Sequence, residues 1–193
     1  MIAPAIPPVV RPAPARLLRH PGPVARERFT VLSDETARSF RICLPEGASL
    51  ADALVEAEKA GAGKSRRGSA AFAILHGSLA PCVYCLAVRD PSGARLVTYS
   101  PMRDAGTVSV QGGAATLGTG LDGKPLVHCH AWFVDPHDGQ VAGGHFDTTA
   151  TRIGPGGLVA RMTLLGDLDI RQVPDAETNH AIFSPVGHLG GVQ

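Results

Sequence analysis

The sequence has 193 residues, with 18 lysines and arginines, 17 aspartates and glutamates, and eight histidines, so its formal net charge is +1. A hydrophobic fraction of 44% excludes a chain that is disordered throughout, and the length fits one domain with its own core. No apolar stretch approaches the roughly 20 residues that cross a bilayer, which predicts that the chain has no membrane span.

We predict a domain over residues 28–186, flanked by an N-terminal arm at 1–27 and a tail at 187–193. Seven of the 16 prolines fall within the first 23 residues, and proline breaks both helices and sheet ladders. The prolines also interrupt the apolar core that a secretion signal requires, so we expect a cytoplasmic protein. Five arginines and one glutamate in residues 1–28 leave 13 basic and 16 acidic residues in the remainder. This acidic excess disfavours strong, autonomous binding to DNA phosphates.

One helix and many short strands are predicted within the domain. Strands are expected at residues 29–32 and 39–44, and a helix at 49–60, because Ser49 is a good N-cap and apolar residues recur behind it with helical spacing. Further strands are expected at residues 70–76, 82–89, 95–99, 107–111, 114–118, 127–134, 140–146, 158–165, 170–173 and 181–183. One helix followed by a run of strands predicts an α+β fold.

Two motifs allow a structural or a chemical interpretation. Lys64, Arg66 and Arg67 form a basic loop after the helix, which is either a solvated turn or a contact to nucleic-acid phosphate. Cys82 and Cys85 form a C-x-x-C motif inside an apolar run. We interpret them as buried strand residues rather than a redox or metal pair, because a redox pair favours a helix N-terminus. The few, scattered cysteines also do not indicate a disulfide-stapled secreted scaffold.

Three histidines are predicted to converge on one face of a hairpin. Side chains alternate along a strand, so His128 and His130 share a face, and a turn at residues 135–139 leads into a second strand containing His145. If the loop is residues 136–139, His130 lies opposite His145, and His128 lies opposite Asp147. A register shift of one residue would turn His145 away.

Imidazole is a favoured ligand of zinc and similar divalent metals, and three histidines with an open fourth position can form a reactive site. His128, His130 and His145 are therefore candidate metal ligands. Asp147 is a candidate fourth ligand, or a partner that orients an imidazole ring. The alternative is that the histidines hydrogen-bond one another or line a subunit interface. Trp132 alternates onto the same face, where it would pack under the site or against another subunit.

The same residues resemble the plants-and-prokaryotes conserved (PPC) domain family. That family has an H-x-H strand, a D-G turn and a G-G-H-L strand. Here the matching residues are His128 and His130, the turn pair Asp138-Gly139, and the run Gly143-Gly144-His145-Phe146, in which phenylalanine replaces the usual leucine. The resemblance covers about residues 29–185, and the histidine hairpin is its most specific part.

The resemblance implies an α+β domain with one principal helix and a largely antiparallel, mixed sheet that assembles as a homotrimer. It implies a binding or regulatory module, with DNA as a partner by association, since plant members carry AT-hooks. Some family structures hold a metal at the histidine cluster, so zinc or another divalent metal is implied here. The Arg-Gly-Arg-Pro core of an AT-hook does not occur in this sequence. Residues 106–111 align with the plant partner-binding motif but keep only its glycine and strand character, so that interaction is not implied.

Three classes of function follow from these patterns. The first is the oligomeric binding module. The second is a metal-dependent enzyme or binder of an unknown small molecule, with Asp147, Asp135 or His180 as the proton carrier, although no catalytic nucleophile is evident. The third is a cupin-like metal enzyme. Cupins place a glutamate four residues after the second histidine, and Val134 occupies that position, which disfavours this third class.

Overall fold

The predicted helix is present. The computed structural model describes residues 19–27, 29–63 and 68–187, and its α-helix, α1, runs Leu50–Ala62. Ser49 caps it by accepting a hydrogen bond from the backbone N–H of Asp52 at 3.1 Å. Gly63 ends it with a φ of 61°, a left-handed conformation that glycine adopts without steric cost. Apolar residues at helical spacing, Leu50, Ala53 and Leu54, face the sheet and are buried.

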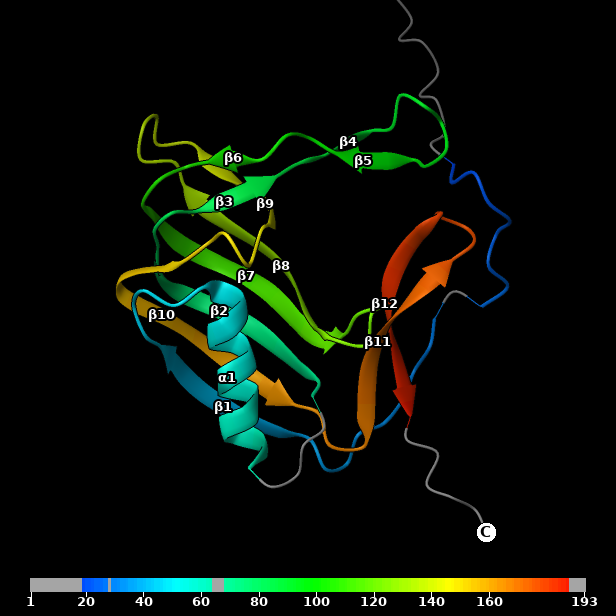
Figure 1. Cartoon of the computed structure of the whole chain (residues 1–193), viewed down its shortest axis with the longest axis horizontal. Coiled ribbons are helices and arrows are strands. Elements are labelled where there is room, and N and C mark those ends of the chain that lie inside the picture. The colour runs from blue at the N-terminus through cyan, green and yellow to red at the C-terminus, as the bar shows by residue number, and fades with distance from the viewer. Residues whose placement is uncertain (1–18, 28, 64–67, 188–193) are drawn as a thin grey trace, which may run out of the picture.

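A large, mostly antiparallel sheet lies behind the helix, which confirms the predicted fold class (Figure 1). Its strands follow the order β1-β10-β2-β7-β8-β9-β3-β6. These strands are β1 (Arg38–Leu44), β10 (Ile153–Leu164), β2 (Ala70–Leu79), β7 (Val108–Thr119), β8 (Pro125–Val134), β9 (Val141–Phe146), β3 (Val83–Cys85) and β6 (Arg103–Asp104).

Two hairpins complete the sheet structure. The antiparallel pair β11 (Leu168–Asp175) and β12 (His180–Gly187) joins the large sheet where Arg171 pairs in parallel with Thr119 of β7. The pair β4 (Ala87–Arg89) and β5 (Val97–Tyr99) forms a separate two-stranded sheet. Figure 1 shows the β11–β12 hairpin beside the end of the large sheet, with β4 and β5 above it. The parallel pair between β11 and β7 makes the large sheet mixed, as predicted.

Several predicted strand boundaries are wrong. Residues 29–32 form no strand, because they have no partner ladder, and Phe29 and Val31 are 89% and 88% exposed. The two strands predicted at residues 107–111 and 114–118 are one strand, β7, which stays paired with β8 through a register shift between Val110 and Gly112. Residues 82–89 divide into β3 and β4, which pair with different partners. The short strand β6 was not predicted, because two residues carry no periodic signal.

Strict alternation along β8 separates the core from the outer face of the sheet. Val127, Cys129, Ala131 and Phe133 are buried on the side of the helix, where Phe133 packs edge-on against Tyr84 with ring centroids 5.5 Å apart. The intervening residues, His128, His130 and Trp132, therefore lie on the opposite face of the strand. The core thus fixes which face carries the histidines.

Part of the predicted arm contacts the domain. The Gly22 N–H donates to the backbone oxygen of Glu177 at 3.0 Å. The Ala25 N–H donates to the Oε2 atom of the same residue at 2.7 Å. Residues 1–18 and 188–193 lie outside the described residues, so the arm and tail boundaries stay predictions. No helix in the described part of the chain is long and apolar enough to cross a membrane.

Candidate metal centre and adjoining cavity

The predicted register of the histidine hairpin is confirmed. His130 pairs with His145 in the β8–β9 ladder. The turn closes through a hydrogen bond of 2.7 Å from the Asp135 N–H to the Gln140 backbone oxygen. Gly144 is required at its position, because a Cβ there would lie 2.3 Å from the backbone oxygen of Cys85. Close approach of β9 to β3 therefore depends on the missing side chain.

Three imidazole rings converge on one point of this hairpin. His128, His130 and His145 each offer a ring nitrogen, and the three nitrogens lie within 4.8 Å of one another. His145 Nδ1 lies 3.4 Å from His130 Nε2. Two nitrogens bound to one tetrahedral zinc are about 3.3 Å apart, given zinc–nitrogen distances of about 2.0–2.1 Å. The spacing of this pair therefore fits a shared ion, and the donor set is one that divalent metals prefer.

Burial favours the neutral, ligand-competent form of two of the three histidines, His128 and His145. Burial, together with the charges of His145 and His130, lowers the pKa of His128 to about 4. Burial and the charge of His130 also lower the pKa of His145, although Asp147 opposes that shift. Neutral imidazole has a lone pair for a metal, whereas imidazolium does not. His128 and His145 are thus prepared to bind a cation at neutral pH.

Asp147 lies near the cluster but takes part in a different interaction. Its Oδ1 accepts hydrogen bonds from the Thr149 hydroxyl at 2.7 Å and the Ala150 N–H at 3.0 Å, and these bonds outweigh its burial to lower the Asp147 pKa. β9 ends at Phe146, so the predicted pair between His128 and Asp147 does not form in the ladder. The chain turns at Asp147 because its carboxylate caps the following backbone.

The other predicted site residues lie at different distances from the histidine group. Asp135 accepts a hydrogen bond from the His137 N–H at 2.9 Å in the hairpin turn, beyond the end of β8 and outside the histidine group. His180 lies on β12, where its Nε2 is 3.1 Å from the backbone oxygen of Val97, and it lines the same cavity as His128. Lys64, Arg66 and Arg67 lie outside the described residues, so the phosphate-contact hypothesis stays a prediction.

A cavity of about 420 Å³ adjoins the histidines and was not predicted from the sequence. His128 forms part of its wall, opposite residues of the β11–β12 hairpin. The Phe183 ring lies 6.3 Å from the His128 ring and the Tyr99 ring 5.0 Å from the His145 ring, measured between centroids. The cavity is also lined by His20, Val97, Thr116, Leu126, Gln172, Thr178, His180, Ala181 and Ile182. Thr116 lies in the wall because it pairs with His128 in the β7–β8 ladder.

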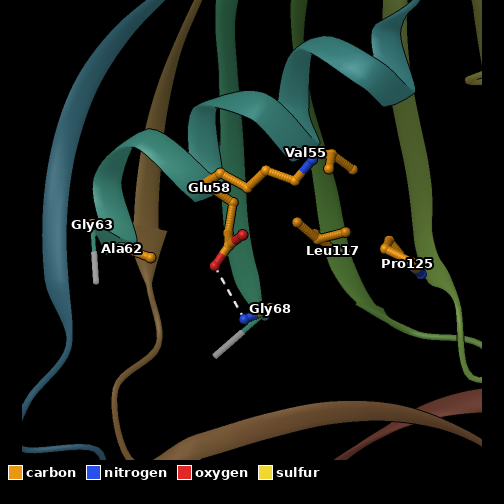
Figure 2. A pocket seen from close by; sticks show the side chains of 8 residues that line it. Val55, Glu58, Ala62, Gly63, Gly68, Leu117 and Pro125 are labelled. Atoms are coloured by element: carbon orange, nitrogen blue, oxygen red, sulfur yellow. Dashed lines mark hydrogen bonds between the residues drawn. The ribbon is translucent and has the colours of Figure 1, made fainter. Parts of the chain in front are cut away.

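A second cavity, of about 310 Å³, lies under α1 (Figure 2). Val55 and Ala62 line it from the helix, and Leu117 and Pro125 from the strands. The buried carboxylate of Glu58 accepts a hydrogen bond of 3.1 Å from the Gly68 N–H within it. Leu117 and its neighbour Thr116 point to opposite faces of β7, so this cavity is on the helix side of the sheet and the histidines are on the other.

The C-x-x-C motif is part of the core, as predicted. Cys82 and Cys85 are fully buried free thiols, and so is Cys129. Burial raises the pKa of Cys82 and of Cys129 to about 12, and it raises that of Cys85 as well. Because the thiolate is the reactive form, these groups are protected by both burial and protonation.

We expect one fast-reacting thiol per folded chain at pH 8, the exposed Cys43. A disulfide reagent with a chromogenic leaving group counts the thiols before and after unfolding. The folded Cys43→Ser variant should show none, and full reactivity should appear only in denaturant. Rapid reaction of Cys82 or Cys85 in the folded chain would contradict the assignment to the core.

Comparison with solved structures identifies the fold. A metal-containing protein from Archaeoglobus fulgidus superimposes with a TM-score of 0.61 at 17% identity, covering 81% of this chain and 99% of that one. A plant- and prokaryote-conserved (PPC) protein from Pyrococcus horikoshii gives 0.54 at 18%, covering 83% and 99%. The chain has the PPC fold. A protein from Ralstonia eutropha described as a "putative DNA-binding protein" shares this fold, with a TM-score of 0.56 at 15% identity, covering 75% and 89%.

Sequence comparison alone does not reveal this relationship. No family model matches the chain, and no curated protein matches it. The resemblance of the histidine hairpin to the PPC pattern nevertheless led to the correct fold. Alternation along the two strands and the geometry of the turn fix which side chains of this hairpin face one another. A short motif therefore preserves the register of the hairpin even when overall sequence identity is low.

Proposed function

We propose that this chain is a metal-binding module of the PPC fold, in which His128, His130 and His145 hold one divalent ion. The observation that carries the proposal is the convergence of three ring nitrogens within 4.8 Å on one hairpin. Their backbone positions are fixed on adjacent, paired strands, so little ordering is needed when the ion binds. The Archaeoglobus fulgidus protein of the same fold is described as metal-containing, which supports the proposal.

Zinc is the ion that this donor set favours, because three imidazoles and an open fourth position are a common zinc arrangement. A bound divalent ion supplies Lewis acidity at that open position. The imidazoles bind as neutral ligands, so they do not offset the charge of the ion. The centre would therefore keep a net positive charge of about two and attract an anionic or lone-pair donor as its further ligand.

Calorimetric titration tests the proposal. Zinc added to the chelator-treated, untagged chain should bind with a stoichiometry of one per chain and release few protons near pH 7, because His128 and His145 are already neutral. The His137→Ala variant, which changes a histidine of the exposed hairpin turn, should give the same titration. A stoichiometry well below one in the intact chain would reject the site.

We propose a homotrimer as the assembled form, through the apolar part of the histidine face. Trp132, Val134 and Val141 are 46%, 40% and 71% exposed, and the pairing of Val134 with Val141 places both on the face that carries Trp132. Exposed apolar side chains gathered on one strand pair are typical of an interaction surface. A second copy of this chain is the partner that we propose for it.

Trp132→Ala is expected to weaken the trimer, because a central tryptophan commonly contributes 2 kcal/mol or more, about 30-fold, to an interface. Sedimentation velocity across a range of concentrations measures the shift toward monomer. The matched control is Leu121→Ala, which truncates a 61% exposed side chain in the turn between β7 and β8. Equal sedimentation and melting of Trp132→Ala and the unmodified chain would place the interface elsewhere.

DNA is a second candidate partner, favoured by the description of the Ralstonia eutropha protein of this fold. Lys64, Arg66 and Arg67 are the residues that we propose for phosphate contacts. The excess of acidic residues after residue 28 predicts that such binding is weak and strongly dependent on salt. Retardation of a DNA duplex that persists unchanged in Lys64→Ala/Arg66→Ala/Arg67→Ala would exclude this loop as the contact.

A further inference from the structure

The cavity beside the histidines and the proposed metal centre share a wall. His128 belongs both to the three-histidine group and to the lining of the 420 Å³ cavity. Tyr99 lines the cavity as well, and its ring lies beside that of His145. A molecule in the cavity would therefore lie next to any ion held by the histidines. This volume is at the small end of the range for small-molecule sites.

Segments distant in the sequence enclose the cavity. The β11–β12 hairpin contributes Phe183 and Ile182, and β8 contributes Leu126, which together form an apolar surface. His20 contributes from the arm, whose neighbours Gly22 and Ala25 are hydrogen-bonded to Glu177. The arm is thus held at the cavity by the same turn that joins β11 to β12.

The wall also contains a few polar groups that are available to a ligand. Gln172 uses its Oε1 to accept from the Leu121 N–H at 3.3 Å, which leaves its amide N–H₂ as a donor. The hydroxyl groups of Tyr99 and Thr116 have no hydrogen-bond partner within the described part of the chain. A mostly apolar wall with a few donors is typical of a site for a small amphipathic molecule.

The described residues of the wall place no acidic side chain against an anion. No aspartate or glutamate is among the described residues that line the cavity. The carboxylate of Asp175 accepts hydrogen bonds from the N–H and hydroxyl of Thr178, so it is directed to the turn between β11 and β12. A divalent ion held by the three imidazoles would place positive charge at the wall that the cavity shares with His128.

We propose that the cavity binds a small carboxylic acid with an apolar body. Its carboxylate would occupy the open position at the metal, and its apolar body would lie against Leu126, Ile182 and Phe183. The Gln172 amide and the Tyr99 hydroxyl are placed to donate hydrogen bonds to polar groups on the acid. This inference rests on the proposed function, because it needs the ion as the anchor for the carboxylate.

Calorimetry with three probes tests each part of the inference on the zinc-loaded full chain. Benzoate combines a carboxylate with an apolar body, acetate keeps only the carboxylate, and benzamide keeps the ring without the charge. Benzoate should bind at least about 10-fold more tightly than either of the other two. Removing zinc with a chelator should reduce the benzoate affinity by at least about 10-fold.

Variants that fill the cavity locate the site. Ala181→Phe and, as a second variant in a different strand, Leu126→Phe should weaken benzoate by about 10-fold or more while keeping one zinc per chain by elemental analysis. The control Val31→Phe adds the same ring at a position that is 88% exposed and should change nothing. Circular dichroism confirms that each variant is folded.

The outcomes separate the two proposals. Zinc bound at one per chain together with equal, weak binding of all three probes would overturn the carboxylate site and leave the metal centre intact. Benzoate binding that survives both cavity-filling variants would also overturn it, because the acid would then bind elsewhere. A chain that takes up no zinc would overturn the metal centre and this inference with it.

Discussion

Replacing both His128 and His130 with alanine is expected to abolish metal binding. The two side chains supply two of the three ring nitrogens that lie within 4.8 Å, and a single remaining imidazole cannot hold a divalent ion against water. Loss of even a residue that orients a ligand costs about 10–100-fold in metal affinity, so loss of two ligands should exceed that range. Elemental analysis should find no ion above background in this variant.

The matched control for this double variant is His137→Ala/His76→Ala, which removes two exposed imidazoles outside the three-histidine group. The control should keep the metal content of the unmodified chain. Both double variants should unfold at similar temperatures once a chelator is present. Metal retained in both variants would contradict the assignment of the ligands, whereas loss from the control as well would show that the site includes residues outside the three-histidine group.

Gly144→Ala is expected to give the second large effect, on the hairpin that carries the site. The new Cβ would lie 2.3 Å from the Cys85 backbone oxygen, and a backbone atom cannot move aside as a flexible side chain can. Overpacking of this kind costs about 1–3 kcal/mol, and forced separation of β9 from β3 would also displace His145. Chemical denaturation should show this loss of stability, together with weaker zinc binding.

Gly187→Ala is the control, because a Cβ at that position at the end of β12 meets no atom within 4 Å. Its free energy of unfolding should remain within about 0.5 kcal/mol of that of the unmodified chain. If Gly144→Ala were equally well tolerated, the close approach of β9 to β3 would not be what holds His145 in place.

The sequence predicted the centre of this site well, because its information is local. The positions of His128 and His130 follow from the two-residue period of a strand, and the turn at residues 135–139 sets the register that places His145 beside them. The helix was also predictable, since Ser49 and the spacing of the apolar residues are local signals. Each of these signals requires knowledge of only one hairpin or one helix.

The cavity was not predictable, because it depends on contacts between distant segments. Phe183 reaches His128 only after β11 pairs with β7, and a pairing of one residue leaves no periodic pattern in the sequence. The sequence offers His180 as a candidate proton carrier, but no local pattern places His180 in the wall of a cavity. The predicted pairing of Asp147 with His128 does not form, since local hydrogen bonds to Thr149 accompany the end of the strand that the alternation would have continued. The role of Asp147 as a fourth ligand or orienting partner stays a prediction.

Elemental analysis of the untagged chain, isolated without added metal or chelator, tests the central claim most directly. We predict about one divalent ion, zinc foremost, for each chain, because the ring nitrogens of His128, His130 and His145 converge before any ion binds. The absence of any ion, both as isolated and after dialysis against zinc, would contradict the metal centre and leave the three histidines as structural residues of the hairpin.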